Sequence, residues 1–311
     1  LADLVMLGRP LVTDPAWGIK AEQGREAQIR YCVSCNTCWG AIVGGSTISC
    51  DNNPRVGADD EADWQPTRVA QSRRIVVVGA GPAGLEAAWV AAARGHEVSV
   101  FAASSDVGGK TRLHSLLPGA ENLSSVYDYQ RLRADEFGVK FHFDHRASAE
   151  DVLALQPDAV ILACGSTPAW PHWLPEDYRD EEFFPDVRAV AARFSIRRAR
   201  EAGTAVIYDQ DHTAFTYATA QLLTQRYDRV VIVTPREGVA AEEPLVNRQG
   251  IHRRLPALGI EVQNWCEPVF DEGLFEGRMT LRPVNAGPMR YIDDVALVTH
   301  APPRVPHDEL V

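Results

Sequence analysis

The stretch RRIVVVGAGPAGLEAAWVAAARGHEVSVF, residues 73–101, decides the fold of this chain. Ile75–Val78 is a continuous β-branched run, which is typical of a parallel strand buried on both faces. A glycine-rich turn follows, then an alanine-rich helix that Gly95 ends, and then a second strand over Glu97–Phe101. The order strand, turn, helix, strand predicts an α/β domain built on a parallel sheet.

The turn in this stretch reads GAGPAG and matches the pattern G-x-G-x-x-G of Rossmann-type nucleotide sites. In that pattern Gly79 makes the tight turn, Gly81 lets a pyrophosphate approach the backbone, and Gly84 lets the helix pack close to the strand. The helix then offers its N-terminus to the phosphate charge. Pro82 and Ala83 complete the candidate binding residues of this loop. We interpret it as a site for a dinucleotide or ADP, with a purely structural turn as the alternative.

One position departs from the usual pattern of such sites. The second strand normally ends in Asp or Glu, which holds the ribose hydroxyls, but this sequence has Ala102 there. We therefore expect a weaker ribose contact, or one supplied from elsewhere by Ser104 or Asp106.

Two further turns resemble parts of flavoprotein domains. Gly108 and Gly109 stand where a flavoprotein has its second glycine pair. Cys164 and Gly165 follow a later apolar strand, in the place of the A-T-G turn that flavin domains keep beside the nucleotide. We include these residues among the candidate cofactor-binding positions.

Residues 203–235, GTAVIYDQDHTAFTYATAQLLTQRYDRVVIVTP, repeat the same rhythm. They predict a strand over Ala205–Tyr208, a helix over Ala214–Arg226 and a strand over Arg229–Thr234. The chain therefore contains a second Rossmann-like half.

The turn of this second half, DQDHTAF, contains no glycine. Without glycine the backbone cannot close on a pyrophosphate, and Asp209 and Asp211 would repel its charge. We expect a domain that keeps its packing role but does not bind NAD(P)H; the alternative is that the cofactor enters by another loop. We expect His212 at the surface or in a capping position.

Residues 31–50, YCVSCNTCWGAIVGGSTISC, hold four of the chain's six cysteines. Cys32, Cys35 and Cys38 are spaced C-x2-C-x2-C, and Cys50 follows after eleven residues. Iron–sulfur clusters are held by sets of four cysteines with such short local spacings. The pattern favours a cluster; a four-cysteine zinc site is the main alternative and disulfides are a weaker one. Cys164 and Cys266 stand alone in apolar surroundings, which predicts packed thiols.

Composition narrows the class of protein. The formal charge is −11 without a basic stripe, which argues against a nucleic-acid partner. No apolar run reaches about 18 residues, so we expect no membrane span. The first residues lack the basic and apolar regions of a secretory signal, and we expect a cytoplasmic protein.

Taken together, these motifs resemble the iron–sulfur flavoproteins of the trimethylamine dehydrogenase and 2,4-dienoyl-CoA reductase family, which carry an Old Yellow Enzyme-type barrel. ADLVMLGRPLVTDP, residues 2–15, resembles the last barrel strand and its loop, where Gly8 and Arg9 would contact FMN phosphate. The resemblance implies an α/β fold with the end of a TIM barrel, a four-cysteine segment and two Rossmann-like, flavin-disulfide-reductase-type domains. The domains it implies are barrel edge 1–25, 4Fe-4S segment and linker 26–70, FAD- or ADP-binding domain 71–170, interdomain crossing 171–200 and second Rossmann-like domain 201–311.

The resemblance also implies an activity. The spacing C-x2-C-x2-C is closer to the amine dehydrogenases of the group than to its reductases. In that branch a methylated amine reduces FMN, and electrons pass through the 4Fe-4S cluster to an electron-transferring flavoprotein. The resemblance implies a homo-oligomer, with FAD or ADP in the first nucleotide site. Most of the barrel is missing here, so we expect a piece of a longer polypeptide or one subunit whose partner carries the barrel, and the sequence names no catalytic residue.

Two other functions stay open at this point. The same architecture serves NAD(P)H-dependent enoate or 2,4-dienoyl-CoA-type reductases, which need a working nicotinamide site. A non-catalytic electron-transfer subunit is the other alternative.

Overall fold

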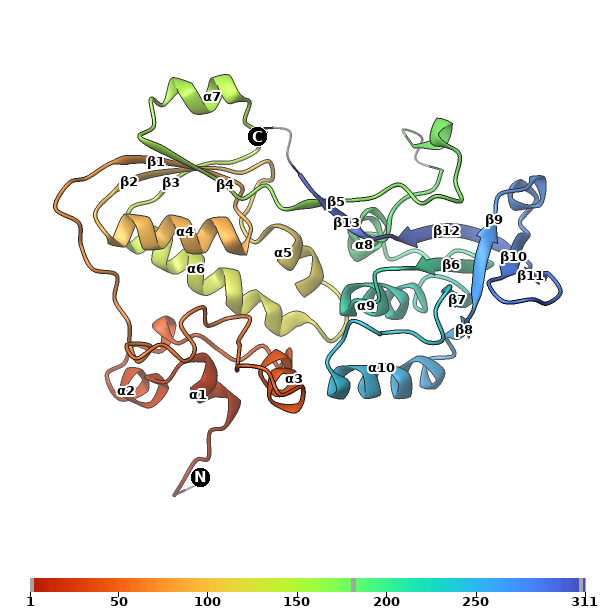
Figure 1. Ribbon diagram of the computed structural model, residues 1–311, viewed down its shortest axis with the longest axis horizontal. Helices are drawn as coiled ribbons and strands as arrows, with labels where there is room; N and C mark the ends of the chain where they lie inside the picture. Colours follow the sequence, from red (N-terminus) through yellow and green to blue (C-terminus); the bar gives the residue numbers. More distant parts are fainter. Residues whose placement is uncertain (1–2, 180–182, 308–309, 311) are drawn as a thin grey trace. The chain divides into compact units, whose positions relative to one another are not determined.

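The computed structural model describes residues 3–179, 183–307 and 310. The chain forms two compact units, of which unit 1 comprises residues 1–115, 121–165 and 307–311, and unit 2 comprises residues 116–120 and 166–306. Each unit is built round a four-stranded parallel sheet of its own (Figure 1).

Unit 1 begins with short helices and continues into the first parallel sheet. Its elements are α1 (Arg9–Thr13), α2 (Trp17–Glu22), η1 (Glu26–Gln28), α3 (Thr37–Val43), β1 (Arg74–Val78), α4 (Pro82–Ala93), β2 (Glu97–Phe101), α5 (Gly109–Ser115), η2 (Glu121–Leu123), α6 (Ser124–Glu136), β3 (Lys140–His142), α7 (Ala149–Ala154) and β4 (Ala159–Leu162).

The sheet of unit 1 has the order β3-β2-β1-β4, with every pair parallel. Helices α4 and α6 cover one face and α7 lies over the other (Figure 1). The side chains of Val77, Leu85 and Ala88 are completely buried between β1 and α4, where alanine lets the helix approach the strand closely. The predicted strands are confirmed, and the helix between them ends just before Gly95, which has the left-handed φ of a helix terminator.

Unit 2 contains the second parallel sheet and smaller antiparallel sheets. Its elements are β5 (Ser166–Pro168), η3 (Glu176–Tyr178), α8 (Val187–Ile196), β6 (Thr204–Asp209), α9 (Ala214–Leu223), β7 (Arg229–Val233), α10 (Leu245–Ala257), β8 (Glu261–Gln263), β9 (Cys266–Val269), η4 (Glu272–Glu276), β10 (Met279–Pro283), β11 (Arg290–Ile292), β12 (Val295–Ala301) and β13 (Arg304–Pro306).

The parallel sheet of unit 2 has the order β12-β6-β7-β8. All six residues of β6 are buried, as are Val230–Val233 of β7, which explains their continuous apolar sequence. Both predicted strands are confirmed within one residue at each end. The predicted helix is also present, although α9 ends at Leu223, three residues earlier than Arg226. The strands β9, β10 and β11 form an antiparallel sheet, and β5 pairs with β13.

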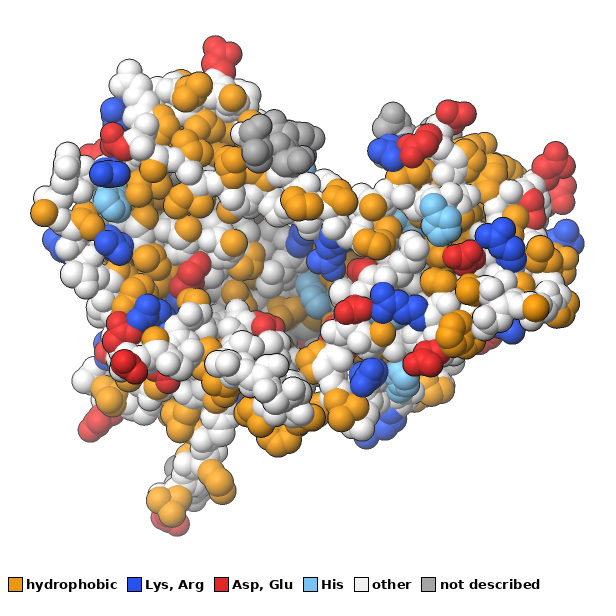
Figure 2. All heavy atoms as spheres, in the orientation of Figure 1, with side chains coloured by type: hydrophobic (Ala, Val, Ile, Leu, Met, Phe, Trp, Pro, Cys, Tyr) orange, Lys and Arg blue, Asp and Glu red, His pale blue; other side chains and the backbone are white. Residues whose placement is uncertain are grey.

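The N-terminal segment differs from the expectation. Residues 3–7 form no strand with any described part of the chain, so the predicted barrel strand is not present here. A strand needs a neighbour for its backbone hydrogen bonds, and none is supplied. Leu4 and Met6 are 90% and 97% exposed, and apolar side chains stand out from this segment in Figure 2.

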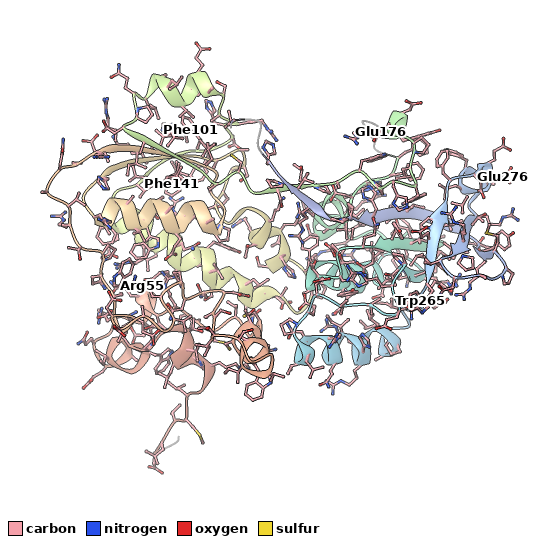
Figure 3. The ribbon with its side chains drawn as sticks, in the orientation of Figure 1. Arg55, Phe101, Phe141, Glu176, Trp265 and Glu276 are labelled. Atoms are coloured by element: carbon pink, nitrogen blue, oxygen red, sulfur yellow. The ribbon has the colours of Figure 1, made fainter. Side chains whose placement is uncertain are left out.

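The segments expected as a surface linker and as an interdomain crossing both contain buried residues. Within residues 51–72, the Asn52 and Asn53 side chains are buried. The guanidinium of Arg55, which is labelled in Figure 3, lies 4.8 Å from the ring centroid of Trp64. Residues 171–200 include α8, which packs on α9 and β12 inside unit 2. Among the described residues, no helix has both the length and the apolar character that crossing a membrane requires.

Candidate functional site

The glycine loop at the carboxyl end of β1 is shaped by close backbone contacts. Gly79 has φ +110°, and a Cβ atom there would lie 2.3 Å from the Ala163 carbonyl oxygen. A Cβ atom on Gly84 would lie 1.9 Å from the Gly79 carbonyl oxygen. Both distances are far below van der Waals contact, so only glycine fits these positions. The roles predicted for them are therefore met by the backbone geometry.

The third glycine of the loop faces open space. A Cβ atom on Gly81 would meet no described heavy atom within 4 Å. Gly81 is the N-cap of the 12-residue helix α4, and no side chain in the described residues caps that end. Unpaired N–H groups and the helix dipole at such an end attract phosphate. The loop and the start of α4 thus fit the pyrophosphate of an adenine nucleotide.

The second glycine pair lies directly against this loop. The backbone N–H of Gly108 donates to the Ala80 carbonyl at 2.8 Å. A Cβ atom on Gly109 would approach the Gly81 Cα atom to 3.2 Å. Gly108 has φ +99°, and a Cβ atom there would lie 2.8 Å from the ring of Tyr127. The structure therefore brings the two glycine motifs together, as their sequence positions led us to expect.

The end of β2 contains no carboxylate for a ribose. Ala102 is buried, and its N–H donates to the His142 carbonyl at 2.9 Å. The Ser104 hydroxyl donates to the Asp106 carbonyl at 2.8 Å, and the Asp106 carboxylate pairs with Arg112 at 2.9 Å. Both side chains considered as substitutes are therefore engaged in local contacts.

The turn after β4, residues 163–165, lies against the glycine loop that follows β1. The Ala163 carbonyl is the group that Gly79 approaches, and Gly165 has φ +77°. The Cys164 thiol lies 3.8 Å from the Val78 carbonyl and is half-buried. In contrast, Cys266 is completely buried, and burial raises the pKa of its thiol. The expectation of a packed thiol is thus confirmed for Cys266 and holds only in part for Cys164.

The four clustered cysteines lie on a loop and a short helix in unit 1. Ser34 and Asn36 have φ values of 56° and 59°, so the chain turns sharply on either side of Cys35. Cys38 is buried on α3, whereas Cys32, Cys35 and Cys50 are partly exposed. None of them forms a disulfide in the described residues.

No three His, Cys, Asp or Glu side chains in the described residues lie close enough together to share one metal ion. An iron–sulfur cluster takes four cysteine thiolates as its ligands, several of them on closely spaced residues. Burial raises the pKa of the Cys35 thiol, an effect that metal coordination would have to overcome. The donor set fits an iron–sulfur cluster, which stays a proposal.

The residues expected at FMN phosphate lie beside the cysteine segment. Gly8 is the N-cap of α1, and the Arg9 guanidinium donates a hydrogen bond to the Asn36 side-chain oxygen. Asn36 follows Cys35 directly. The Thr13 hydroxyl, one turn further along α1, lies 3.6 Å from the Cys50 sulfur. The segment that resembles the FMN loop is therefore in contact with two positions of the cysteine motif.

Unit 2 contains a buried polar cluster at the carboxyl ends of β6 and β7. The Tyr217 hydroxyl donates to the Asp209 carboxylate at 2.6 Å, and both side chains are inaccessible to solvent. Burial raises the pKa of Asp209 to about 7. The His212 ring lies 3.1 Å from the Thr234 hydroxyl, and burial lowers its pKa to about 4. The expectation of a surface position for His212 is wrong, because its ring fills the space between the two strand ends.

The N-terminus of α9 is occupied by carboxylates of the chain itself. Ala214 N–H donates to Glu243 at 2.6 Å, and Thr213 N–H donates to Asp211 at 3.0 Å. The Asp211 carboxylate also accepts from the Thr216 hydroxyl at 2.9 Å. These contacts take the place that a phosphate would need. The sequence analysis identified Asp211 but missed Glu243. Nothing in the residues around Glu243 indicates that it accepts a hydrogen bond from a helix start 29 residues away.

The crevice between β6 and β12 is closed as well. The N–H groups of Gln210 and Asp211 both donate to the Ala301 carbonyl at 2.9 Å. This crevice is the point where strand order reverses in the sheet, and nucleotides bind at such points in open α/β sheets. The loop after β6 therefore bonds to β12 where a cofactor would enter.

Comparison with known proteins places the chain in a family. The family model described as pyridine nucleotide-disulphide oxidoreductase matches residues 73–265, which is more than half of the chain. The probable N-methylproline demethylase of Rhizobium meliloti (strain 1021) is 35% identical over 261 residues, which cover 83% of this chain and 37% of that protein. The NADH oxidase of Thermoanaerobacter brockii is 30% identical over 270 residues, covering 84% and 40%.

A solved structure extends the likeness to nearly the whole chain. Histamine dehydrogenase from Rhizobium sp. 4-9 superposes with a TM-score of 0.83 at 26% identity, covering 99% of this chain and 45% of that one. The chain thus spans less than half the length of each of these proteins. It belongs to the pyridine nucleotide-disulphide oxidoreductase family and is related to the flavin-dependent oxidoreductases of the trimethylamine dehydrogenase type.

Proposed function

We propose that this chain is part of an amine-oxidising iron–sulfur flavoenzyme. In this proposal the substrate is an N-methylated amine and the acceptor is an electron-transferring flavoprotein. The names of the demethylase and of histamine dehydrogenase support an amine as substrate. The barrel that holds most of the FMN lies outside this chain, on the same polypeptide or on a partner subunit. A cytoplasmic homo-oligomer is part of the same proposal.

The observation that carries the proposal is the filled nucleotide position of unit 2. Asp211 and Glu243 accept hydrogen bonds from the first N–H groups at α9, and the Ala301 carbonyl closes the adjoining crevice. A nicotinamide nucleotide would bring its pyrophosphate against two carboxylates at hydrogen-bond distance from the same donors. We infer that this site does not bind NAD(P)H, as expected of an enzyme reduced by its own substrate.

The glycine loop of unit 1 has the opposite character. Its open space at Gly81, its uncapped helix and the adjacent Gly108 and Gly109 support binding of FAD or ADP. The lack of a carboxylate at Ala102 argues that recognition rests on the pyrophosphate more than on the ribose. We propose that ADP is a sufficient ligand for this site.

The cysteine segment would hold the electron-carrying group. We propose Cys32, Cys35, Cys38 and Cys50 as ligands of a 4Fe-4S cluster. Bound FMN would supply the chemistry for hydride acceptance, and a cluster held by these cysteines would supply one-electron transfer. Arg9 would neutralise FMN phosphate charge from its position beside Asn36, which joins the flavin end to the cysteine segment.

The experiment is an anaerobic reduction of the native assembly, followed by visible and electron paramagnetic resonance spectra. Separate samples receive NADH, NADPH and a panel of methylated amines. We expect an amine to bleach the flavin and produce the signal of a reduced cluster, and the nicotinamides to leave both unchanged. Reduction by NADPH within seconds would contradict the proposal.

A reductase is the second candidate, because the NADH oxidase of Thermoanaerobacter brockii is similar over 84% of the chain. In that case NAD(P)H would enter near the start of α9 in unit 2, against the negative charge of Asp211. An Asp211→Asn variant separates the two candidates. If nicotinamide enters near α9, removing this charge will accelerate reduction by NADH; in the amine dehydrogenase it will change nothing, since NADH is not a reductant.

A further inference from the structure

A chain of buried polar contacts joins the glycine loop of unit 1 to the cysteine segment. Gln130, on α6, donates from its Nε2 atom to the Pro82 carbonyl at 3.0 Å and to Glu86 Oε2 at 2.9 Å. Pro82 is the residue after Gly81 in the loop, and Glu86 lies one turn further along α4. A single buried amide is therefore shared between the loop backbone and the α4 carboxylate.

The Glu86 carboxylate also binds Arg30, which lies two residues before Cys32 in the sequence. Arg30 Nη2 donates to Glu86 Oε1 at 2.6 Å, and Arg30 Nη1 donates to the Asn52 carbonyl at 2.9 Å. The Arg30 guanidinium also lies 4.2 Å from the ring centroid of Tyr129 on α6. A guanidinium bonded in this way on several sides holds one geometry, because its planar donors have fixed directions.

The network ends on the backbone at Cys32. The Asn52 side-chain amide donates to the Tyr31 carbonyl at 3.0 Å, and the Ser125 hydroxyl donates to the same carbonyl at 3.2 Å. Asn122, from η2, donates to the Val33 carbonyl. The peptide group before Cys32 and the peptide group after Val33 are therefore held by side chains that belong to the network, to η2 or to the start of α6.

We propose that adenine-nucleotide binding at the glycine loop is coupled to the cysteine segment through Gln130, Glu86 and Arg30. The inference rests on the proposed function, which assigns a cluster to these cysteines. A nucleotide at Gly81 orders the loop and the Pro82 carbonyl, and Gln130 passes that restraint to Glu86 and Arg30. Binding of the nucleotide or of the cluster then orders residues that the other must also order, so each strengthens the binding of the other by the same factor.

The coupling is measured as protection of the cysteine segment by ADP. Titration calorimetry first establishes that ADP binds to the chain as purified. The rate of iron release to a chelator is then measured with and without saturating ADP, under exclusion of oxygen. After removal of iron, the labelling rate of the Cys32 thiol is measured in the same pair of conditions by peptide mass. We expect saturating ADP to slow both rates about fivefold or more, the lower range of allosteric coupling.

The variants remove the connection without removing either site. Gln130→Met keeps the side-chain length but loses the shared donor, and we expect ADP to bind while its protective effect falls below about twofold. Asp128→Ala is the matched control, because Asp128 is an exposed residue on the same helix, and it should retain full protection. Glu86→Gln is the second variant if Gln130→Met does not fold, since it removes the charge that faces Arg30.

The outcomes separate this inference from the proposed function. A chain that contains no iron contradicts the cluster assignment, while the labelling of Cys32 still tests the coupling. The coupling is overturned if ADP does not bind, if bound ADP leaves both rates unchanged, or if Gln130→Met keeps the full protection of the wild-type chain.

Discussion

The Tyr217 hydroxyl lies 2.6 Å from a carboxylate oxygen of Asp209, and neither side chain is exposed to solvent. Asp209 Oδ1 also accepts the His212 backbone N–H at 3.0 Å. Burial raises the pKa of Asp209 by more than the hydrogen bonds from Tyr217 and His212 lower it, and the pKa moves from 3.8 to about 7. The carboxyl group at this strand end is therefore held in an environment that favours its protonated form.

This raised pKa predicts a pH dependence of stability. A group that binds its proton more tightly in the folded state contributes stability that is complete below the unfolded pKa and is lost as pH rises through the folded pKa. For Asp209 the loss runs from pH 3.8 to about 7. Asp209→Asn should remove it, so the variant should gain in urea midpoint over the wild type as pH rises across that range. An unchanged difference between the two proteins would contradict the assignment.

His212 gives the free energy of unfolding the opposite pH dependence, so its effect can be distinguished from that of Asp209. Its pKa is lowered from 6.5 to about 4, so its neutral form contributes stability that is lost as pH falls through that range. In the Asp209→Asn variant this acidic loss should remain, together with that of His300, whose pKa burial also lowers, and the free energy of unfolding should rise with pH up to 6.5 and then level off. A steady decline above that pH would show that another group dominates.

The glycine loop predicts different effects for two similar substitutions. Gly84→Ala places a Cβ atom 1.9 Å from a carbonyl oxygen and should cost at least about 2 kcal/mol in the free energy of unfolding. Gly81→Ala meets no described atom within 4 Å, so the fold should keep its stability. That space is proposed for pyrophosphate, however, and ADP binding should weaken about tenfold or more. Thermal unfolding and calorimetry measure the two effects, and equal stability of both variants would contradict the geometry.

The capping carboxylate of α9 predicts a moderate loss. Glu243→Ala leaves the Ala214 N–H without its acceptor and should lower the free energy of unfolding by about 1 kcal/mol, the usual value of a helix cap. Glu237→Ala is the matched control, because this exposed residue should change stability by less than about 0.5 kcal/mol. Equal melting temperatures of the two variants would show that Glu243 does not act as a cap.

The cysteine assignment predicts a sharp division among six single variants. Serine at Cys32, Cys35, Cys38 or Cys50 should abolish or strongly reduce bound iron and acid-labile sulfide, since a cluster needs all of its thiolates. Cys164→Ser and Cys266→Ser should leave both contents unchanged. Zinc in place of iron, without sulfide, would support the alternative that the spacing left open.

The local features of this chain were predictable from sequence because their causes are local. The role of Gly84 depends on the Gly79 carbonyl, which the same turn supplies, and the need for glycine at position 79 was visible from the motif although the group that it approaches, the Ala163 carbonyl, is distant in sequence. The buried strands β1 and β6 were visible as β-branched runs for the same reason.

Features that depend on distant partners were missed or mistaken. The ion pair between Arg30 and Glu86 joins residues 56 positions apart, and no periodic pattern in the sequence predicts it. His212 was expected at the surface or in a capping position, yet its ring bonds to Thr234, 22 residues away, and is buried. Residues 2–15 resemble the last barrel strand and its loop, and residues 3–7 have no neighbouring strand among the described residues with which to pair.

The most direct test of the account is a pair of calorimetric titrations on the purified chain. ADP is titrated first, and NADH is then titrated into the chain saturated with ADP, so that the adenosine half of NADH cannot use the glycine loop. We predict one ADP site, weakened by Gly81→Ala, and no further binding of NADH. A second binding event for NADH in the presence of ADP would show that unit 2 accepts a nicotinamide cofactor, and would contradict the account.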